Sequence, residues 1–388
     1  MPDKELHEKY MQRALELAVK GEGRVEPNPV VGAVVVKDNR VLGEGYHEYF
    51  GGPHAEINAL NACREPTDGA TLYITLEPCA HFGKTPPCVD AVIQAGIKNV
   101  VIATRDPNPI TDNRGVNKLK EAGLTVVERI LQSKARQINA PFFKLHREGL
   151  PYIIAKWAMS ADGKIATRTG DSKWISSEAS RNWLARLREK VGAVMVGIET
   201  VLKDDPQLLV KNIPDATGSS ALGGFTASGS ASLTARNPRR IILDTYARLP
   251  LDSQIIKTLD QAETYVAVGP SAPQEKVKQL WESHCHVLEI EEIGGRLNFI
   301  KLARKIAESG INKIMIEGGG EVLASAFETG LVDEVIIFLA PKIIGGRDAK
   351  TPVEGAGIEL VKDAILLEEI TAQQVDNDIV IRGRLRKT

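Results

Sequence analysis

The alternation of short apolar runs with helical stretches constrains the fold of this chain more than any other feature. Runs rich in β-branched residues predict strands at 30–36, 41–45, 70–75, 98–103 and 124–129. Helical periodicity predicts helices at 4–20, 54–64, 87–95 and 115–122. Asp38-Asn39, between the first two strands, is a turn signal. Strands and helices that alternate at this spacing predict a mostly parallel sheet covered on both faces.

The same alternation starts again in the second half of the chain, after a basic helical stretch at 133–147. Strands are predicted at 152–158, 191–196, 240–243, 265–268, 313–316 and 334–339, with a helix at 177–189. Because Gly149-Leu150-Pro151 interrupts the pattern, the 388 residues are predicted to form two α/β domains, 1–148 and 149–388. Residues 216–235, rich in Gly, Ser and Ala, are predicted to form a flexible insertion in the second domain.

Charge and cysteine usage exclude several classes of protein. The chain has 49 basic and 50 acidic residues, so it offers no broad cationic field for nucleic acid or an anionic membrane. An apolar run long enough to span a bilayer is missing, and the N-terminus predicts an amphipathic helix rather than a secretion signal. The four cysteines are too few for a disulfide scaffold. We therefore expect a cytoplasmic protein in which paired cysteines bind metal.

One histidine, one glutamate and two cysteines form the first candidate site. His54, Cys79 and Cys88 make a three-ligand zinc set, which is typical of a catalytic zinc that keeps its fourth position for water. Glu56 completes the H-x-E pattern with a downstream P-C, the signature of zinc deaminases, in which the glutamate moves protons and is not a ligand. These residues predict hydrolytic deamination, with Glu56 as the catalytic acid and base.

A structural zinc site is the alternative, and Cys63 is the local candidate for a fourth ligand. We favour the catalytic interpretation because Glu56 has no purpose in a closed site. The sequence also departs from the general C-x-x-C spacing, since eight residues separate Cys79 from Cys88. The intervening segment carries His81 and Lys84, which suit an anionic group on the substrate.

Longer motifs give the chain a family resemblance. His54-Ala55-Glu56, the run PCAHFGKTPPC at 78–88, PNPVVG at 27–32 and DPNP at 106–109 resemble the bifunctional riboflavin-biosynthesis deaminase/reductase family. The resemblance implies a cytidine-deaminase-like three-layer αβα domain at the N-terminus. It also implies a substrate, 2,5-diamino-6-ribosylamino-4(3H)-pyrimidinone 5′-phosphate. On this resemblance the residues that line the deaminase pocket are Asn28, His47, Ala55, Lys84, Asp106 and Asn108.

The second domain lacks a G-x-G-x-x-G fingerprint but has glycine-rich turns at 314–321 and 195–200. Such turns favour phosphate only weakly by themselves. The segments 158–166, 171–176 and 204–206 resemble the family's reductase half, a dihydrofolate-reductase-like α/β domain that uses NADPH to reduce the ribosyl group to ribityl. The resemblance implies that NADP contacts Ala158, Trp174, Thr200, Asp204, Gly319, Gly320, Glu321, Val322, Leu323, Ala324 and Ser325. It implies that the sugar-phosphate substrate contacts Ser172, Arg188, Leu208 and Glu317.

The expected function is therefore a zinc hydrolase joined to an NADPH oxidoreductase, acting in succession on one phosphorylated pyrimidine. A homo-oligomer, dimer or tetramer, is expected, with no nucleic-acid or membrane partner. The alternatives are a tRNA adenosine-type deaminase with an appended reductase-like domain and a zinc-binding protein without catalysis. The near-neutral charge and the long cysteine spacing disfavour the first, and Glu56 disfavours the second. No general acid of the reductase half can be named from the sequence.

Overall fold

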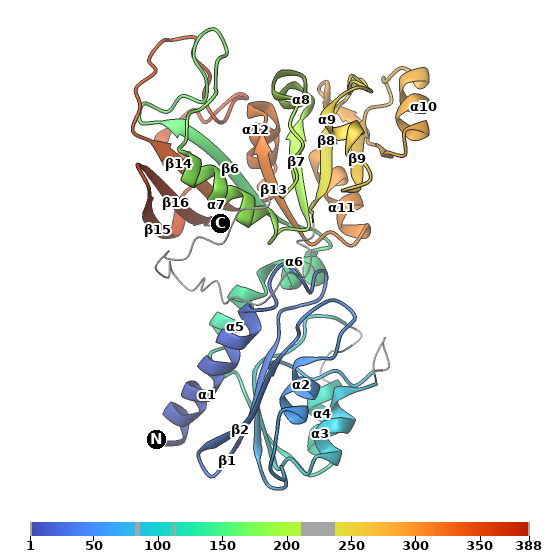
Figure 1. Ribbon diagram of the computed structural model, residues 1–388, viewed down its shortest axis with the longest axis vertical. Helices are drawn as coiled ribbons and strands as arrows, with labels where there is room; N and C mark the ends of the chain where they lie inside the picture. The colour runs from blue at the N-terminus through green and yellow to red at the C-terminus, as the bar shows by residue number, and fades with distance from the viewer. Residues whose placement is uncertain (1, 82–85, 110, 112–113, 211–236, 387–388) are drawn as a thin grey trace. The chain divides into compact units, whose positions relative to one another are not determined.

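The computed structural model describes residues 2–81, 86–109, 111, 114–210 and 237–386. The predicted pocket residue Lys84 and the predicted insertion 216–235 lie outside the described residues. The chain divides into two compact units, Met1–Leu150 and Pro151–Thr388 (Figure 1). Among the described helices, none has the length and apolar character that crossing a membrane requires.

The first unit contains a five-stranded sheet with the order β2-β1-β3-β4-β5. Its strands are β1 (Gly32–Lys37), β2 (Arg40–Tyr46), β3 (Thr71–Leu76), β4 (Asn99–Thr104) and β5 (Thr125–Glu128). Strands β2, β3, β4 and β5 run in the same direction, whereas β1 is antiparallel to both of its neighbours, β2 and β3. The expectation of a mostly parallel sheet is therefore confirmed for this unit, with β1 as the one reversed strand among the described strands of the sheet. Asp38 and Asn39 both have positive φ, which suits the tight β1–β2 hairpin that turns the chain back.

Helices cover both faces of this sheet, which confirms the expected three-layer αβα architecture. They are α1 (Pro2–Val19), α2 (Ala55–Asn61), α3 (Cys88–Gln94), α4 (Arg114–Glu121), α5 (Gln132–Ile138) and α6 (Ala140–Glu148). Ala33 and Val35 of β1 pack in one core with α2, α3 and α4, whereas Val34 and Val36 pack in another with α1 and α5. Successive strand residues point to opposite faces, so this apolar run supplies both cores.

The single helix expected at 133–147 is wrong, because the chain breaks at Asn139 into α5 and α6. Asn139 leaves helical geometry at φ −108 and ψ 17, and Pro141 follows at the start of α6. The buried Asn139 side chain accepts from Val30 N at 2.8 Å and donates to Val30 O at 2.9 Å. These two hydrogen bonds tie the break to the chain just before β1.

The second unit contains a nine-stranded sheet with the order β10-β9-β8-β7-β13-β6-β14-β16-β15. Its strands are β6 (Tyr152–Ser160), β7 (Ala193–Gly197), β8 (Arg239–Leu243), β9 (Thr264–Val268), β10 (His286–Glu289), β13 (Lys313–Gly318), β14 (Val332–Ala340), β15 (Leu367–Val375) and β16 (Asp378–Leu385). All neighbours from β10 to β14 are parallel, and β14, β16 and β15 are antiparallel. The hairpin β11 (Glu292–Ile293) and β12 (Arg296–Leu297) forms a separate small sheet.

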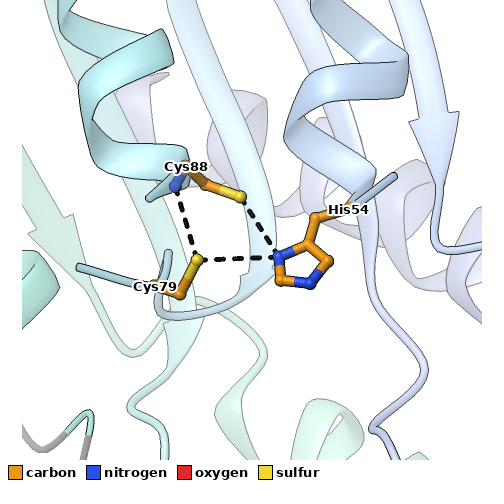
Figure 2. A group of neighbouring side chains, drawn as sticks. All are labelled: His54, Cys79 and Cys88. Carbon is orange, nitrogen blue, oxygen red and sulfur yellow. Dashed lines mark hydrogen bonds between the residues drawn. The ribbon is translucent and has the colours of Figure 1, made fainter. Parts of the chain in front are cut away.

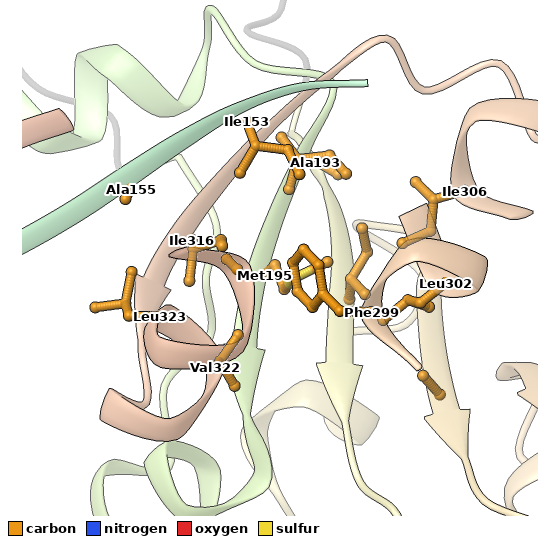
Figure 3. Packing of buried hydrophobic residues seen from close by; sticks show 14 of the residues in the cluster. Ile153, Ala155, Ala193, Met195, Phe299, Leu302, Ile306, Ile316, Val322 and Leu323 are labelled. Carbon is orange, nitrogen blue, oxygen red and sulfur yellow. The ribbon is translucent and has the colours of Figure 1, made fainter. Parts of the chain in front are cut away.

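The core of the second unit lies between this sheet and two helices. The helices of the unit are α7 (Glu178–Arg188), α8 (Ile198–Asp204), α9 (Gln254–Lys257), α10 (Gln274–Glu282), α11 (Phe299–Glu308), α12 (Gly320–Glu328) and the 3-10 turn η1 (Val361–Asp363). Phe299, Leu302 and Ile306 of α11 pack with Met195 of β7 in one buried cluster (Figure 3). Trp183 of α7 packs edge-on against Phe338 of β14. This packing fixes the carboxyl ends of β7 and β13, where the glycine-rich turns lie.

Candidate functional site

Three separate elements of the first unit bring His54, Cys79 and Cys88 together. His54 is the N-cap of α2, Cys88 is the first residue of α3, and Cys79 follows β3. His54 Nδ1 lies 3.2 Å from Cys88 Sγ and 3.6 Å from Cys79 Sγ (Figure 2). The potential ligand atoms of the three residues all lie within 4.8 Å of one another. The structure therefore assembles the set that the sequence indicated.

The donor set and its spacing fit a tetrahedral zinc ion. Zinc bonds of about 2.1 Å to nitrogen and 2.3 Å to sulfur place the two ligand atoms about 3.6 Å apart. The pKa of the Cys79 thiol lies below its ordinary value, because hydrogen bonds with Cys88 and His54 favour its thiolate. Among the described residues, Cys63 does not belong to this group, and its thiol donates to Ala59 O at 3.3 Å. Three protein ligands leave a tetrahedral ion one position for water.

Glu56 lies beside this group, in the first turn of α2. Its side chain is buried, with 3% of the residue exposed. Burial raises the pKa of its carboxyl to about 7, partly offset by the nearby charge of His54. Cys88 forms a hydrogen bond with the Glu56 side chain. Glu56 is thus a carboxyl group that can hold or release a proton near neutral pH, adjacent to the candidate zinc ligands.

Close packing of α2 on β2 fixes the position of His54 and Glu56. A Cβ on Gly45 would lie 2.3 Å from the backbone nitrogen of Ala59 and 2.8 Å from the carbonyl oxygen of Ala55. Only a residue without a side chain allows the helix to approach the strand this closely. The buried Ala55 and Ala59 continue the same tight contact.

Two predicted pocket residues of the deaminase half form a hydrogen-bonded chain next to His54. Asn28 Nδ2 lies 3.3 Å from His47 Nε2, and His47 Nδ1 lies 3.0 Å from Pro53 O. The rings of His47 and His54 meet edge-on at 5.4 Å. Burial lowers the pKa of His47, so its neutral form is favoured, with Nδ1 donating to Pro53 and Nε2 accepting from Asn28.

Asp106 and Asn108 follow β4, where a buried glutamate that the sequence analysis did not single out organises the chain. Asn108 N donates to Asp106 Oδ1 at 2.8 Å. Glu77, at the end of β3, accepts from Asp106 N at 3.4 Å and from Val116 N at 3.1 Å. Glu77 therefore joins the segment that carries Cys79 to the Asp106 turn and to α4. In the sequence, Glu77 could have been identified as a single carboxylate directly after a predicted buried strand.

The candidate phosphate-binding residues of this unit are only partly described. Lys84 lies outside the described residues. His81 Nδ1 is buried and has no hydrogen-bond partner within the part of the chain that the structure describes. Burial raises the pKa of the nearby Asp106 carboxyl, and hydrogen bonds from Asn108 and Thr111 oppose this rise. A buried nitrogen without a partner suits contact with a polar ligand.

The turns after β7 and β13 in the second unit pack closely against each other through glycines. A Cβ on Gly318 would lie 3.0 Å from Thr200 Oγ1, and one on Gly197 would lie 3.0 Å from Val322 Cγ2. Gly319 has a φ of +96 and lies against Gly197. The two turns therefore pack closely on each other at the N-terminus of α12, an end of a helix that favours anions. A Cβ on Gly320 would lie 2.6 Å from Glu354 Cγ, so the Glu354 side chain lies against the first residue of α12. Gly319 and Gly320, predicted to contact NADP, lie at these turns.

The other residues predicted to contact the cofactor differ in their burial and in the elements that carry them. The side chains of Val322, Leu323 and Ala324 are buried in the core, so only their backbone is available to a ligand. Glu321 forms an ion pair with Arg296. Ser325 and Gly320 lie on the same helix, whereas Ala158 is at the end of β6 and Asp204 at the end of α8. Trp174 is 62% exposed, and Lys173 Nζ lies 3.6 Å from Asp204 Oδ1.

Arg188 and Glu317, both predicted to contact substrate, contact each other. Arg188 Nε and Nη2 each donate to a different Glu317 carboxylate oxygen at 2.7 Å, and Nη1 donates to Leu209 O at 2.8 Å. Burial raises the pKa of Glu317, but the Arg188 charge and hydrogen bonds hold it below its ordinary value. Leu208, with a φ of +56, lies next to the carbonyl that Arg188 binds. Ser172 is half-buried in the 171–176 segment.

Lys156 is the residue of this site that the sequence analysis missed. It lies within the largely buried strand β6, and its ammonium is 5.3 Å from the centre of the Phe338 ring. Burial lowers its pKa to about 8, opposed by Glu317 and assisted by Arg188. A single lysine inside an apolar parallel strand was the signal that could have identified it.

Comparisons with known proteins cover both units. Residues 4–104 match the family model of the cytidine and deoxycytidylate deaminase zinc-binding region, and residues 151–381 match that of the RibD C-terminal domain. The riboflavin biosynthesis protein RibD of Actinobacillus pleuropneumoniae is 40% identical over 96% of this chain and 93% of its own length. That of Escherichia coli is 39% identical over 92% of this chain and 93% of its own length.

Solved structures are similar over the whole chain as well. A RibD structure from Acinetobacter baumannii has a TM-score of 0.84 and 34% identity, covering 99% of this chain and 100% of the other. The Thermotoga maritima diaminohydroxyphosphoribosylaminopyrimidine deaminase/5-amino-6-(5-phosphoribosylamino)uracil reductase has a TM-score of 0.80 and 35% identity, with the same coverage. These similarities confirm the expected fold classes of both halves.

Proposed function

The chain belongs to the RibD family of bifunctional deaminase/reductases of riboflavin biosynthesis, and from this premise we propose which residues perform each reaction. The deaminase part uses Zn²⁺ and the reductase part uses NADPH. The grouping of His54, Cys79 and Cys88 beside the buried Glu56 is the observation that carries the proposal. We assign His54, Cys79 and Cys88 to zinc binding and Glu56 to proton transfer.

In the proposed deamination, water adds to the ring carbon that bears the amino group, and ammonia leaves. When bound, Zn²⁺ supplies a Lewis acid that makes hydroxide available at neutral pH. The Glu56 carboxylate takes one proton of the attacking water and passes it to the ring nitrogen. It then takes the remaining proton of the added hydroxyl and delivers it to the amino group, so that ammonia leaves and a ring carbonyl forms. A carboxyl pKa of about 7 suits both directions of this transfer.

Substrate positioning in the deaminase half is assigned to the residues around this group. Asn28, His47 and Ala55 contact the pyrimidine from the side of α2, and Asp106 and Asn108 from the turn after β4. The support is that His47 lies edge-on to His54 and that Glu77 joins the Asp106 turn to the Cys79 segment. We assign the phosphate to Lys84, with His81 as the described residue that accompanies it.

In the proposed reduction, opening of the ribosylamine ring gives an imine at C1′. NADPH, when bound, would supply hydride to that carbon, and the imine nitrogen would take up a proton. We assign the cofactor phosphate to the glycine turn at Gly318 and Gly319, against which Thr200 lies. Arg188 fixes the Glu317 carboxylate through two hydrogen bonds. We add Lys156 as the cation that faces the substrate, because a partly buried lysine beside this pair can donate a hydrogen bond or a proton.

The division of labour follows the sequence prediction: residues 1–148 perform deamination and residues 149–388 perform reduction. Ser172 and Leu208 complete the proposed sugar-phosphate site. Ala158, Trp174, Asp204 and residues 319–325 complete the proposed NADP site. We propose that the enzyme acts in the cytoplasm on a small phosphorylated pyrimidine, without nucleic-acid or membrane partners.

We propose in addition that the chain forms a homo-oligomer, a dimer or tetramer. The support is a concentration of exposed apolar side chains near the C-terminus: Ile343, Ile358, Val361, Leu366 and Ile370. β15 is also the last strand of its sheet, so its outer backbone edge is open to pairing. Large exposed apolar patches commonly mark protein interfaces.

The experiment that tests the proposed function measures both reactions on the full chain. The diaminopyrimidine phosphate is added, and ammonia release and NADPH oxidation are followed in turn. Glu56→Gln is expected to abolish ammonia release while zinc stays bound and the reductase still accepts the deaminated intermediate. Ammonia release from tRNA or single-stranded DNA instead would favour the nucleic-acid alternative. Retained turnover by Glu56→Gln would refute its assigned role.

A further inference from the structure

An exposed tryptophan of the second unit has one face of its ring occupied by an arginine. Trp174 is 62% exposed, and the Arg181 guanidinium carbon lies 4.5 Å from the centre of its indole ring. Arg181 belongs to the first turns of α7, and Trp174 to the segment before that helix. A guanidinium over an indole face is a favourable cation–π contact. One face of the indole is therefore occupied, while the side chain as a whole stays accessible.

Hydrogen bonds fix both partners of this contact. Arg181 Nη1 donates to Ser176 O at 2.7 Å, and Lys342 Nζ donates to Trp174 O at 2.6 Å. The segment 174–176 is thereby held at the carbonyl of Trp174 and again at the carbonyl of Ser176. Holding an exposed side chain in one orientation reduces the entropy that is lost when a ligand packs against it.

The helix that carries Arg181 is itself anchored. Ser177 caps α7 by accepting from Ser180 N at 3.2 Å. The buried Asp378, at the start of β16, accepts from Ser177 N at 2.7 Å and from Ser180 Oγ at 2.6 Å. A carboxylate at a helix N-terminus also interacts favourably with the helix dipole. Arg181 therefore projects from a support that is fixed to the central sheet.

We propose that Arg181 is a positioning residue that holds the Trp174 indole as a rigid platform for a planar ring of NADPH. The inference rests on the proposed function, which places Trp174 at the cofactor. Arg181 acts through the ring and does not itself bind the cofactor. Because the platform contacts the cofactor equally before and during hydride transfer, its loss raises KM for the cofactor and leaves kcat unchanged.

A direct contact of Arg181 with the 2′-phosphate of NADPH is the competing role for this half-buried arginine. The two roles differ in their response to NADH, which lacks that phosphate. A platform contacts both cofactors, so its loss raises the KM for NADPH and the KM for NADH by the same factor. A phosphate contact affects NADPH alone.

The test uses the full-length enzyme with Arg181→Gln and Arg181→Lys, and Arg186→Gln as the matched control. Arg186 lies on the same helix and is exposed. We expect Arg181→Gln to raise the KM for NADPH and for NADH by about 2- to 5-fold, the size of an exposed cation–π contact. Arg181→Lys keeps the cation and should recover most of this loss. Wild-type kcat and an unchanged unfolding midpoint by tryptophan fluorescence exclude a folding defect.

A double-mutant comparison separates positioning from a merely structural role. In a Trp174→Ala background, Arg181→Gln is expected to cause no further change in KM, because the ring through which it acts is missing. Additive losses, an effect on NADPH alone, or an unchanged KM in Arg181→Gln would each overturn the inference. If Trp174→Ala itself leaves both KM values unchanged, the cofactor assignment of Trp174 in the proposed function fails instead.

Discussion

Removal of Arg188 tests a largely buried ion pair of the reductase half. The side chains of Arg188 and Glu317 are only 15% and 6% exposed, and two hydrogen bonds of 2.7 Å join them. Arg188→Ala leaves the Glu317 carboxylate buried and without its guanidinium partner. Breaking a buried ion pair in this way costs about 3–5 kcal/mol. Lys156 lies near enough to act on Glu317 electrostatically, so we expect the lower part of that range.

Tryptophan fluorescence during urea unfolding is the assay, and the sequence makes it selective. All four tryptophans, at positions 157, 174, 183 and 281, lie in the second unit. The fluorescence transition therefore reports the reductase half alone. Ammonia release under native conditions serves as the control and should stay unchanged. The double variant Arg188→Met with Glu317→Leu removes both charges and should recover much of the lost stability.

The pH dependence of the folding stability provides an independent test of the same ion pair. Because the folded pKa of Glu317 lies below its ordinary value, the pair stabilises the fold at pH values above that ordinary value. This stability is lost as the pH falls through the folded pKa, and Arg188→Ala should not show that loss. A cost below about 1 kcal/mol for Arg188→Ala, typical of an exposed pair, would refute the reasoning.

Three further predictions concern other parts of the chain. Lys156 has a pKa of about 8, so the rate of NADPH oxidation should fall as the pH rises through that value. Lys156→Met should be slower and lack that fall, and an unchanged pH profile would argue against the role of Lys156. Gly45→Val places side-chain atoms where a Cβ already lies 2.3 Å from Ala59 N, so ammonia release and bound zinc should be lost while NADPH oxidation survives. Equal loss of both activities would contradict that local explanation. Asn139→Ala leaves the buried N–H and C=O of Val30 without their partners, which should cost about 2–4 kcal/mol. The thermal midpoint of deaminase inactivation measures this cost, and a midpoint equal to that of the wild type would show that other groups satisfy Val30.

The sequence predicted the features that depend on local patterns. Apolar runs located the strands that carry both sites, since a buried parallel strand needs an uninterrupted apolar run. The motif around His54 and Glu56 identified the candidate zinc group because residue type and spacing express the chemistry directly. The family, the two fold classes and the bifunctional activity expected on resemblance are confirmed.

Contacts between distant residues could not be predicted in the same way. The Arg188–Glu317 pair joins positions 129 residues apart, and neither residue's local sequence indicates the other. The resemblance implied that Arg188 and Glu317 both contact the substrate, and it did not indicate that the Arg188 guanidinium donates to Glu317 and to Leu209 O. The break at Asn139 likewise depends on Val30, which is 109 residues away.

The sheet of the first unit shows a limit of a different kind. Alternating strands and helices favour parallel pairing, but the hairpin at Asp38-Asn39 reverses the first strand relative to its neighbours. Strand β15 was not predicted because most of its residues are exposed and its sequence alternates polar or charged residues with apolar ones, so no apolar run marks it. Pairing with β16, rather than burial, defines it as a strand.

The most direct test of the central claim determines what His54, Cys79 and Cys88 bind. Elemental analysis together with X-ray absorption spectroscopy at the zinc edge should be performed on purified, active full-length enzyme. We predict one zinc ion per chain, bound by two sulfurs, one imidazole nitrogen and one oxygen of solvent, and lost when Cys88 is replaced by serine. An active enzyme without metal, or an ion bound by three sulfurs and one nitrogen, would contradict it.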